Sequence, residues 1–326
     1  MNSGAGQPPR QRRIVDAHHH LWDLSKNYHP WLCDATPIPF RYGDYTAIRK
    51  NYLLPDYLND AQNYQVQGSV YVETEWDSLD YKGEVLYVAE MKKVQRLPTV
   101  GVMHVRLDDL DAEEKLEFQS QFNFVRSIRH KPKAHTNPGN NEPGGMENTQ
   151  WRIGFNSLSR LGLRFDLQTP WWHMHEAHAL ASAYPETSII INHSGLPADR
   201  SSAGLHQWKQ AMQKVSECPN VSIKISGIGI PKSPWTIAAN GRIVETLIDL
   251  FGIARCMFAS NFPVDKVCAS FDESTVVLKK LWPALLNKKK TCCLGPMQIV
   301  FTPWGWNERQ TRPKLYRSRL NGIANG

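Results

Sequence analysis

The sequence predicts a single-domain α/β protein built as a (β/α)8 TIM barrel. Three observations support this class: eight short apolar segments rich in β-branched residues, helix-like segments between them, and polar side chains where the apolar segments end. Strands that alternate with helices form parallel sheets, and eight parallel strands with crossover helices fit a closed barrel better than an open sheet. A chain of 326 residues is long enough for one such barrel with basic, irregular N- and C-terminal tails.

The strands are expected where β-branched and apolar residues cluster between Gly, Pro and polar residues. Their ranges are 13–20, 67–73, 99–106, 124–129, 164–168, 188–193, 221–226 and 256–261. Between them, 81–94 and 241–251 show the apolar spacing of helices that cover a sheet.

Functional side chains stand at the C-terminal ends of most of these predicted strands. In a (β/α)8 barrel this end carries the active site. Arg106 or Gln168 alone would be compatible with ordinary hydrogen bonding, but apolar strands do not place a whole polar set at one end by chance. The set comprises His18 and His20, Glu73, Arg106, Arg129 with His130, Asp166 with Gln168, His193, Lys224 with Ser226, and Asn261.

The run of three histidines at the end of the first strand is the leading candidate site. Side chains alternate along a strand, so His18 and His20 share one face and His19 points to the other as a packing residue. Two imidazoles that converge at a barrel mouth can hold a divalent metal ion or bind a substrate anion.

The net charge of +7 does not indicate a nucleic-acid partner. Residues 288–326 hold eight basic side chains against one acid, so this segment alone accounts for the whole excess, and the rest of the chain is neutral. Nucleic-acid binders spread basic residues over a folded face. We therefore interpret the basic ends as tails and expect a small molecule as the partner, with no nucleic acid and no membrane, and with a homo-oligomer left open.

The six cysteines and the N-terminus favour a cytoplasmic protein. No Cys pair has metal-ligand spacing, residues 1–13 lack the apolar core of a signal peptide, and no apolar run reaches the length of a membrane span.

The segment Asp-Ala-His-His-His-Leu-Trp-Asp at 16–23 resembles the opening of the amidohydrolase-related family, in its branch of sugar-lactone and pyrone-dicarboxylate lactonases. Further stretches are similar to this family in the same order. They lie at 70–73, 162–168, 190–197, 223–227 and 258–264. The resemblance extends over residues 13–290, which we take as the barrel domain after a disordered basic tail at 1–12.

The resemblance implies a hydrolase that uses water to attack a C–O or C–N bond. It implies that His18, His20 and His193 are catalytic and bind metal or substrate, with one divalent metal ion, zinc, or none. The carboxylate expected at the end of the eighth strand is replaced by Asn261, and an amide cannot act as a general base at neutral pH. Another carboxylate must then take this role, and Asp166, Asp265 and Glu73 are the candidates.

The expected activity is that of a lactonase or carboxylic-ester hydrolase acting on a small, oxygenated, anionic ring. Arg129 would hold the acid group, since Arg binds carboxylates through two parallel hydrogen bonds. The other expected substrate-binding residues are Glu73, His130, Lys224 and Asn261. The alternatives are amide hydrolysis or non-oxidative decarboxylation, which the same superfamily performs, and a non-catalytic ligand-binding barrel.

Residues 291–326 form an atypical C-terminal tail. The family closes here with a helix, whereas this segment has no apolar period. One choice of codons for 294–303, read one nucleotide earlier, gives a sequence that matches the family's closing motif. We therefore predict a frameshift in the gene or its sequence.

Overall fold

Eight parallel strands form a single sheet in the order β1 to β8, and every neighbouring pair is parallel. The computed structural model describes residues 12–140 and 142–275. Of the predicted tail 1–12, only Arg12 is described, and it begins β1; the predicted tail 291–326 and the end of the barrel domain lie outside the described residues. The strands are β1 Arg12–His19, β2 Tyr64–Val72, β3 Val100–His104, β4 Val125–Arg129, β5 Arg164–Leu167, β6 Ile189–Ile191, β7 Val221–Ile225 and β8 Cys256–Phe258. All eight predicted strands are confirmed.

The end of the last strand returns to the first strand and closes the barrel. His19 and Phe262 form a parallel bridge, and the amide of His20 donates to the Phe262 carbonyl at 2.8 Å. The buried carboxylate of Asp16 reinforces this junction, because it accepts hydrogen bonds from the Ser260 amide at 2.8 Å and the Ser260 hydroxyl at 2.5 Å. The predicted (β/α)8 barrel is therefore the observed fold.

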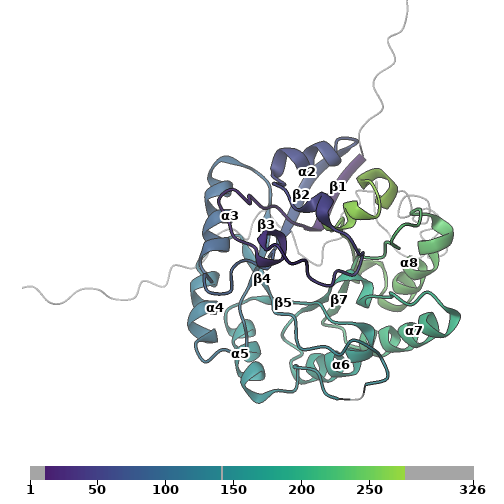
Figure 1. Ribbon diagram of the computed structural model, residues 1–326. Coiled ribbons are helices and arrows are strands. Elements are labelled where there is room, and N and C mark those ends of the chain that lie inside the picture. Colours follow the sequence, from purple (N-terminus) through teal and green to yellow (C-terminus); the bar gives the residue numbers. More distant parts are fainter. Residues whose placement is uncertain (1–11, 141, 276–326) are drawn as a thin grey trace, which may run out of the picture.

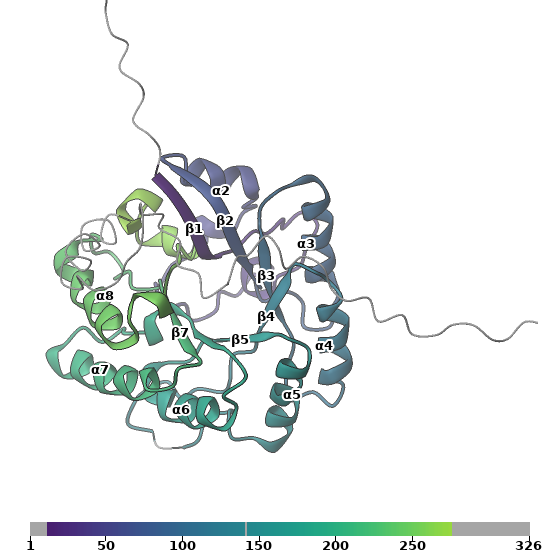
Figure 2. The same ribbon diagram turned by 180° about the vertical axis from the view of Figure 1, so that it is seen from behind.

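Helices surround the strands on the outside of the barrel (Figures 1 and 2). They are α2 Leu54–Asp60, α3 Gly83–Val94, α4 Ala112–Ser120, α5 Thr149–Arg160, α6 Met174–Ala183, α7 Ser202–Ser216 and α8 Ile237–Phe251, whereas the short helix α1 Pro30–Cys33 lies in the connection between β1 and α2. Short 3₁₀ turns are η1 Thr46–Ile48, η2 Trp171–His173, η3 His193–Gly195, η4 Ile253–Arg255 and η5 Val264–Val267. Among the described residues, no helix has both the length and the apolar character needed to cross a membrane.

Helix α8 begins four residues before the predicted range because its first turn depends on a cap. The Thr236 hydroxyl accepts a hydrogen bond from the Ala239 amide at 3.1 Å, which satisfies one of the free N–H groups of the first turn. The predicted apolar stripe then follows, and Val244, Leu247 and Phe251 are buried against the barrel.

Among the described residues, the segment between β1 and α2 is the longest connection from a strand to the next long helix, and it crosses the mouth of the barrel (dark purple in Figure 1). It contains α1 and η1 and is anchored by a bridge between Trp22 and Tyr52. Its aromatic residues pack on one another, with Trp31 lying 5.7 Å from Tyr45 between ring centroids. This segment therefore forms a packed cover over the strand ends.

Candidate active site at the barrel mouth

His18 and His20 face the same side of β1, as their spacing predicts. Their Nε2 atoms lie 3.2 Å apart, and both residues are buried. His19 points the other way, where its Nε2 atom lies 2.9 Å from the Ser69 hydroxyl and its ring stacks on Tyr57. The alternation of the strand thus separates two imidazoles that face each other inside the barrel from one that packs on Tyr57, and the predicted packing role of His19 is confirmed.

The hydrogen bonds of His20 define its tautomer. Its Nδ1 atom lies 2.8 Å from the Val72 carbonyl, which can only accept, so Nδ1 carries the proton. Burial, together with the Arg129 guanidinium, lowers the pKa of His20 to about 3, so the ring is neutral. Its Nε2 atom is therefore an acceptor, and His18 Nε2, 3.2 Å away, can donate a hydrogen bond to it.

Asn261 presents a second acceptor to the same point. Its Nδ2 atom donates to Asp265 Oδ1 at 2.8 Å, which leaves Oδ1 facing His20 Nε2 at 3.3 Å. Two acceptors that face each other this closely are satisfied by a hydrogen-bond donor or a cation between them.

This donor set fits a divalent metal ion. Two imidazole nitrogens bound to one tetrahedral zinc would lie about 3.3 Å apart, close to the observed separation of the His18 and His20 nitrogens. The amide oxygen of Asn261 is a neutral third ligand and holds a metal less strongly than a carboxylate would. In the described part of the chain, no three His, Cys, Asp or Glu side chains together form a metal-binding group, so the three-histidine set that includes His193 stays a prediction.

His193 follows β6 and lies beside the pair. Its ring centroid is 4.7 Å from that of His18, and its Nδ1 atom lies 3.0 Å from the Ser226 hydroxyl. Residues 193–196 all have positive φ, including the non-glycine residues His193 at 53°, Ser194 at 58° and Leu196 at 55°. Such backbone conformations are unfavourable for side-chain-bearing residues and cluster at functional sites, which supports a functional position for this imidazole.

A cavity of about 280 Å³ opens above these side chains, a size suited to a small molecule. His20, Glu73, Arg129, Gln168 and His193 line its floor, so the predicted strand ends do meet in one place. Its outer wall comes from the cover segment, and this wall consists of Trp31, Ile38, Pro39, Phe40 and Arg41.

Arg129, which was expected to bind the acid group of the substrate, already donates hydrogen bonds to other residues of the protein. Its Nε and Nη2 atoms donate to the carboxylate of Glu73 at 2.5 Å and to the Glu73 carbonyl at 2.7 Å, while Nη1 reaches Gln168 at 3.1 Å. Burial opposes ionisation of Glu73, but Arg129 outweighs it and holds the pKa of Glu73 at about 2. Both residues line the cavity, yet Glu73 is a weak base at neutral pH.

Asp166 and Lys224 lie below the cavity in a fully buried network. Lys224 Nζ is 2.5 Å from Asp166 Oδ1, and the other carboxylate oxygen accepts from the Ser127 hydroxyl at 2.7 Å. Asn192 donates to Oδ1 as well, at 2.8 Å. With both of its oxygens engaged and no access to the cavity, Asp166 is placed to balance Lys224 rather than to exchange protons with a substrate.

Asp265 orients the amide of Asn261. Besides Asn261, its Oδ1 accepts the Tyr42 hydroxyl at 2.8 Å, and its Oδ2 accepts the Gly227 amide at 2.9 Å. Burial raises the pKa of Asp265, although Arg41 and Asn261 favour its charged form. The carboxylate is buried behind Asn261, so it fixes which end of the amide faces His20.

His130 does not belong to the site, and its predicted role in substrate binding requires correction. Its Nδ1 atom accepts hydrogen bonds from the Leu107 amide at 3.0 Å and from Trp151 Nε1 at 3.1 Å. The residue directly follows β4, so the alternation that turns Arg129 inward turns His130 outward.

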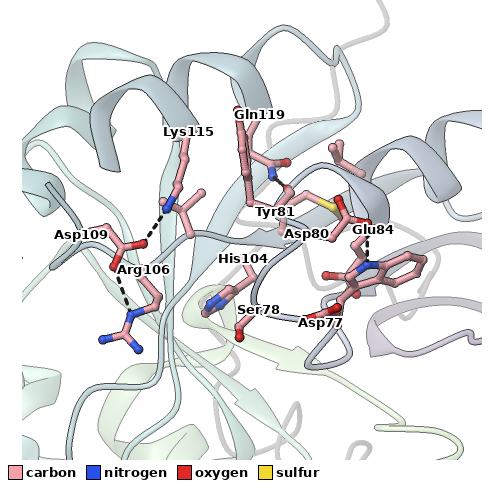
Figure 3. A pocket seen from close by; sticks show the side chains of 14 residues that line it. Asp77, Ser78, Asp80, Tyr81, Glu84, His104, Arg106, Asp109, Lys115 and Gln119 are labelled. Atoms are coloured by element: carbon pink, nitrogen blue, oxygen red, sulfur yellow. Dashed lines mark hydrogen bonds and ion pairs between the residues drawn. The ribbon is translucent and has the colours of Figure 1, made fainter. Parts of the chain in front are cut away.

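A second, smaller hollow lies beside β3, as Figure 3 shows. Its volume is about 40 Å³, too small for a ring-sized substrate. Glu84, His104 and Gln119 line it together with Arg106, and none of the side chains at the cavity floor contributes. Burial, followed by the nearby Glu73, raises the pKa of Glu84 to about 7.

Arg41 and Tyr42 were not among the residues expected from the sequence. They lie in the cover segment, which has no strand or helix period to mark an inward face. The run Phe-Arg-Tyr, a cation between two aromatic residues shortly after the first strand, was the available signal.

Comparisons with known proteins agree with this fold and show the family of the chain. The sequence model of the family described as amidohydrolase matches residues 15–278. The uncharacterized protein y4mH of Sinorhizobium fredii is 38% identical, over 82% of this chain and 91% of that protein. An L-fucono-1,5-lactonase of Burkholderia multivorans is 23% identical, over 82% of this chain and 87% of the lactonase. Among solved structures, an amidohydrolase from Burkholderia multivorans with bound zinc superposes with a TM-score of 0.66 at 20% identity, over 83% of this chain and 92% of that one.

Proposed function

Because the chain belongs to the amidohydrolase family, we propose that it is a hydrolase that opens a small cyclic ester, a lactone, by attack of water. The observation that carries the proposal is the convergence of His18, His20 and the Asn261 oxygen, with His20 lining the cavity of about 280 Å³. The similarity to an L-fucono-1,5-lactonase supports the choice of a lactone among the substrates of the family.

The chain's own residues hold and orient the reactants. Water at the cavity floor would donate hydrogen bonds to His20 Nε2 and Asn261 Oδ1, which positions its oxygen for attack on the lactone carbonyl. A divalent ion held by His18, His20 and Asn261 would replace these two hydrogen bonds and would supply Lewis acidity that lowers the pKa of the attacking water.

His193 is the proposed proton carrier. Its ring lines the cavity, and burial lowers its pKa well below the usual range, so the ring is neutral. With its Nδ1 proton donated to the Ser226 hydroxyl 3.0 Å away, Nε2 would be free to accept a proton. Attack forms a bond between the water oxygen and the carbonyl carbon, and the ring C–O bond then breaks. The proton taken from water ends on the ring oxygen, which becomes the hydroxyl group of the product. This assignment replaces the carboxylate base expected from the sequence and leaves Asp265 as a positioning residue.

The direct test is a lactone panel assayed for acid release, with the metal content of the purified protein measured in parallel. We expect one equivalent of acid per lactone opened, with activity that depends on His18 and His20. Release of carbon dioxide instead would favour decarboxylation, and ammonia or amine release from amide analogues would favour an amide hydrolase. A protein that binds lactones without acid release, with or without added zinc, would favour the ligand-binding barrel and contradict the proposal.

A further inference from the structure

The side-chain amide of Gln168 has the one orientation that its neighbour allows. A guanidinium group only donates hydrogen bonds, so the Gln168 atom that lies 3.1 Å from Arg129 Nη1 is the amide oxygen. Arg129 itself is held by two hydrogen bonds to Glu73, so it keeps this oxygen in place. The amide nitrogen Nε2 carries two N–H donors and has no hydrogen-bond partner in the part of the chain that the structure describes.

These unused donors belong to the cavity at the barrel mouth. Gln168 directly follows β5, is partly buried, and lines the cavity together with His20, Arg129 and His193. In the sheet, β5 lies between β4, which ends at Arg129, and β6, which ends two residues before His193. Gln168 therefore stands on the strand next to the one that leads to the proposed proton carrier.

The other polar side chains of the site are acceptors or are already paired. His20 Nε2 and Asn261 Oδ1, which would position the attacking water, accept hydrogen bonds. Each cation that lines the cavity is paired with a carboxylate, so a substrate oxygen would compete with that partner. The pairs are Arg129 with Glu73, Lys131 with Glu75, and Arg41 with Asp265.

Opening of a lactone requires a donor on the carbonyl side of the ester. When the water oxygen bonds to the carbonyl carbon, the π electron pair of the C=O bond moves onto the carbonyl oxygen, which becomes an oxyanion. When the ring C–O bond breaks, this pair forms the C=O bond again, and the ring oxygen takes the proton carried by His193. Donors that are already oriented stabilise the oxyanion more than the neutral carbonyl and so lower the barrier.

We propose that Gln168 donates a side-chain hydrogen bond to the carbonyl oxygen of the bound lactone and stabilises the oxyanion that forms there. The proposal rests on the proposed lactonase function and deepens it by naming a further catalytic residue. His20, Asn261 and His193 then serve the attacking water as acceptors, while Gln168 serves the ester as a donor. The hydrogen bond from Arg129 to the amide oxygen polarises the amide and makes its N–H groups better donors.

Two substitutions at Gln168 separate hydrogen-bond donation from packing. Gln168→Met removes the N–H groups and nearly keeps the length of the side chain. Gln168→Glu also removes them, but it keeps an oxygen for Arg129 and adds a charge that the guanidinium attracts. The substrate is δ-valerolactone, a ring with no polar group besides the ester. We expect both variants to lose about 100-fold in kcat, with KM changed by less than about threefold.

Gln119→Met is the matched control. Gln119 is a buried amide whose Nε2 donates to the Tyr81 carbonyl at 2.9 Å, and it does not line the cavity. This variant should keep the wild-type kcat. Far-UV spectra and melting temperatures establish that all three variants are folded. A Gln168→Glu protein with the wild-type kcat would show that the residue only holds Arg129, and this result, or a loss confined to KM, would overturn the proposal.

A binding measurement separates the role of Gln168 from the lactonase reaction. The probe is the six-membered cyclic ester of 4-hydroxybutylphosphonate, whose tetrahedral, anionic phosphorus group has the shape and charge of the intermediate. It should bind the wild type at least about tenfold more tightly than Gln168→Met in calorimetric titrations. If δ-valerolactone is not hydrolysed but this difference holds, the proposed reaction fails and the donor site stands. If the probe binds both proteins equally, or binds neither, the role of Gln168 is wrong.

Discussion

His20 Nε2 and Asn261 Oδ1 lie 3.3 Å apart, and a hydrogen bond on the far side of each group leaves both as acceptors. The Val72 carbonyl fixes the imidazole, and the carboxylate of Asp265 fixes the amide. Asn261 stands where a carboxylate was expected at the end of the eighth strand. The nearest carboxylate, that of Asp265, follows it by four residues and orients its amide. The first and eighth strands together build a point that requires a proton donor or a cation.

Asn261→Asp should increase zinc affinity by at least about tenfold, because a charged oxygen would replace a neutral one at the same position. Without metal the new carboxylate would face Asp265 Oδ1, now 2.8 Å from Asn261 Nδ2, so the metal-free variant should melt at a lower temperature. Calorimetric zinc titration and thermal melts with and without zinc measure both effects. Asn261→Ala should bind zinc more weakly than the wild type. Equal affinities in all three proteins would show that Asn261 does not contribute to a metal site.

Replacement of His20 and His19 should separate chemistry from packing within one strand. His20→Ala removes an acceptor at the cavity floor, so we expect a loss of kcat/KM of at least about 100-fold with an unchanged far-UV spectrum. His19→Ala removes the stacking on Tyr57 and the contact with Ser69, so it should lower the melting temperature more than it lowers the rate. The opposite pattern, an unfolded His20 variant or an inactive but stable His19 variant, would reverse the two assignments.

Glu84 should make folding stability fall as the pH rises. Its pKa is raised from 4.5 to about 7 in the folded protein, so between these values the unfolded chain gives up a proton that the folded chain keeps. The free energy of unfolding therefore falls as the pH rises from 4.5 to about 7. The total decrease is on the order of 3 kcal/mol once the pH exceeds 7. Glu84→Gln keeps an oxygen for its three donors from Tyr71 and Thr74 but cannot ionise.

The stability difference between Glu84→Gln and wild type should therefore increase in favour of the variant from pH 5 to pH 8, measured by urea unfolding. Glu90→Gln on the same helix serves as the control, because Glu90 is 69% exposed and should show no such change. A difference that stays constant with pH for Glu84→Gln would mean that this carboxyl ionises normally in the folded state.

The sequence was sufficient to predict the barrel and the end of it that carries the site. Strand positions follow from apolar clusters, and alternation correctly divided His18 and His20 from His19. Access to the cavity was not predictable, since Asp166 and Lys224 face inward like Arg129 but bind each other and do not line the cavity. His130 was wrongly grouped with Arg129, because the alternation along β4 that turns Arg129 inward turns the next residue outward.

The contribution of the cover segment was not predictable for a different reason. Arg41 and Tyr42 reach Asp265 across more than 220 residues of sequence, through a connection held by aromatic packing and by the bridge at Trp22. Such contacts depend on tertiary structure and leave no periodic pattern in the sequence.

The buried pair of Asp166 and Lys224 should be strongly coupled in stability. Asp166→Asn leaves the Lys224 ammonium, which is fully buried, without a counter-charge and should destabilise the fold by about 3–5 kcal/mol. Lys224→Met leaves a carboxylate that still has Ser127 and Asn192 as donors, so its cost should be smaller. The double variant should be more stable than the sum of the two changes predicts, by at least about 2 kcal/mol in urea unfolding.

The surface pair of Lys266 and Asp60 is the control for this cycle. Lys266 is 45% exposed, so the corresponding coupling should be below about 1 kcal/mol. Additive effects at Asp166 and Lys224 would show that the two charges do not depend on each other. Strong coupling would show that each buried charge stabilises the other. The same Lys224 ammonium also acts on His18, whose pKa is lowered first by burial and then by this charge. Loss of that ammonium should then make His18 easier to protonate and shift the acid limb of the activity profile to higher pH.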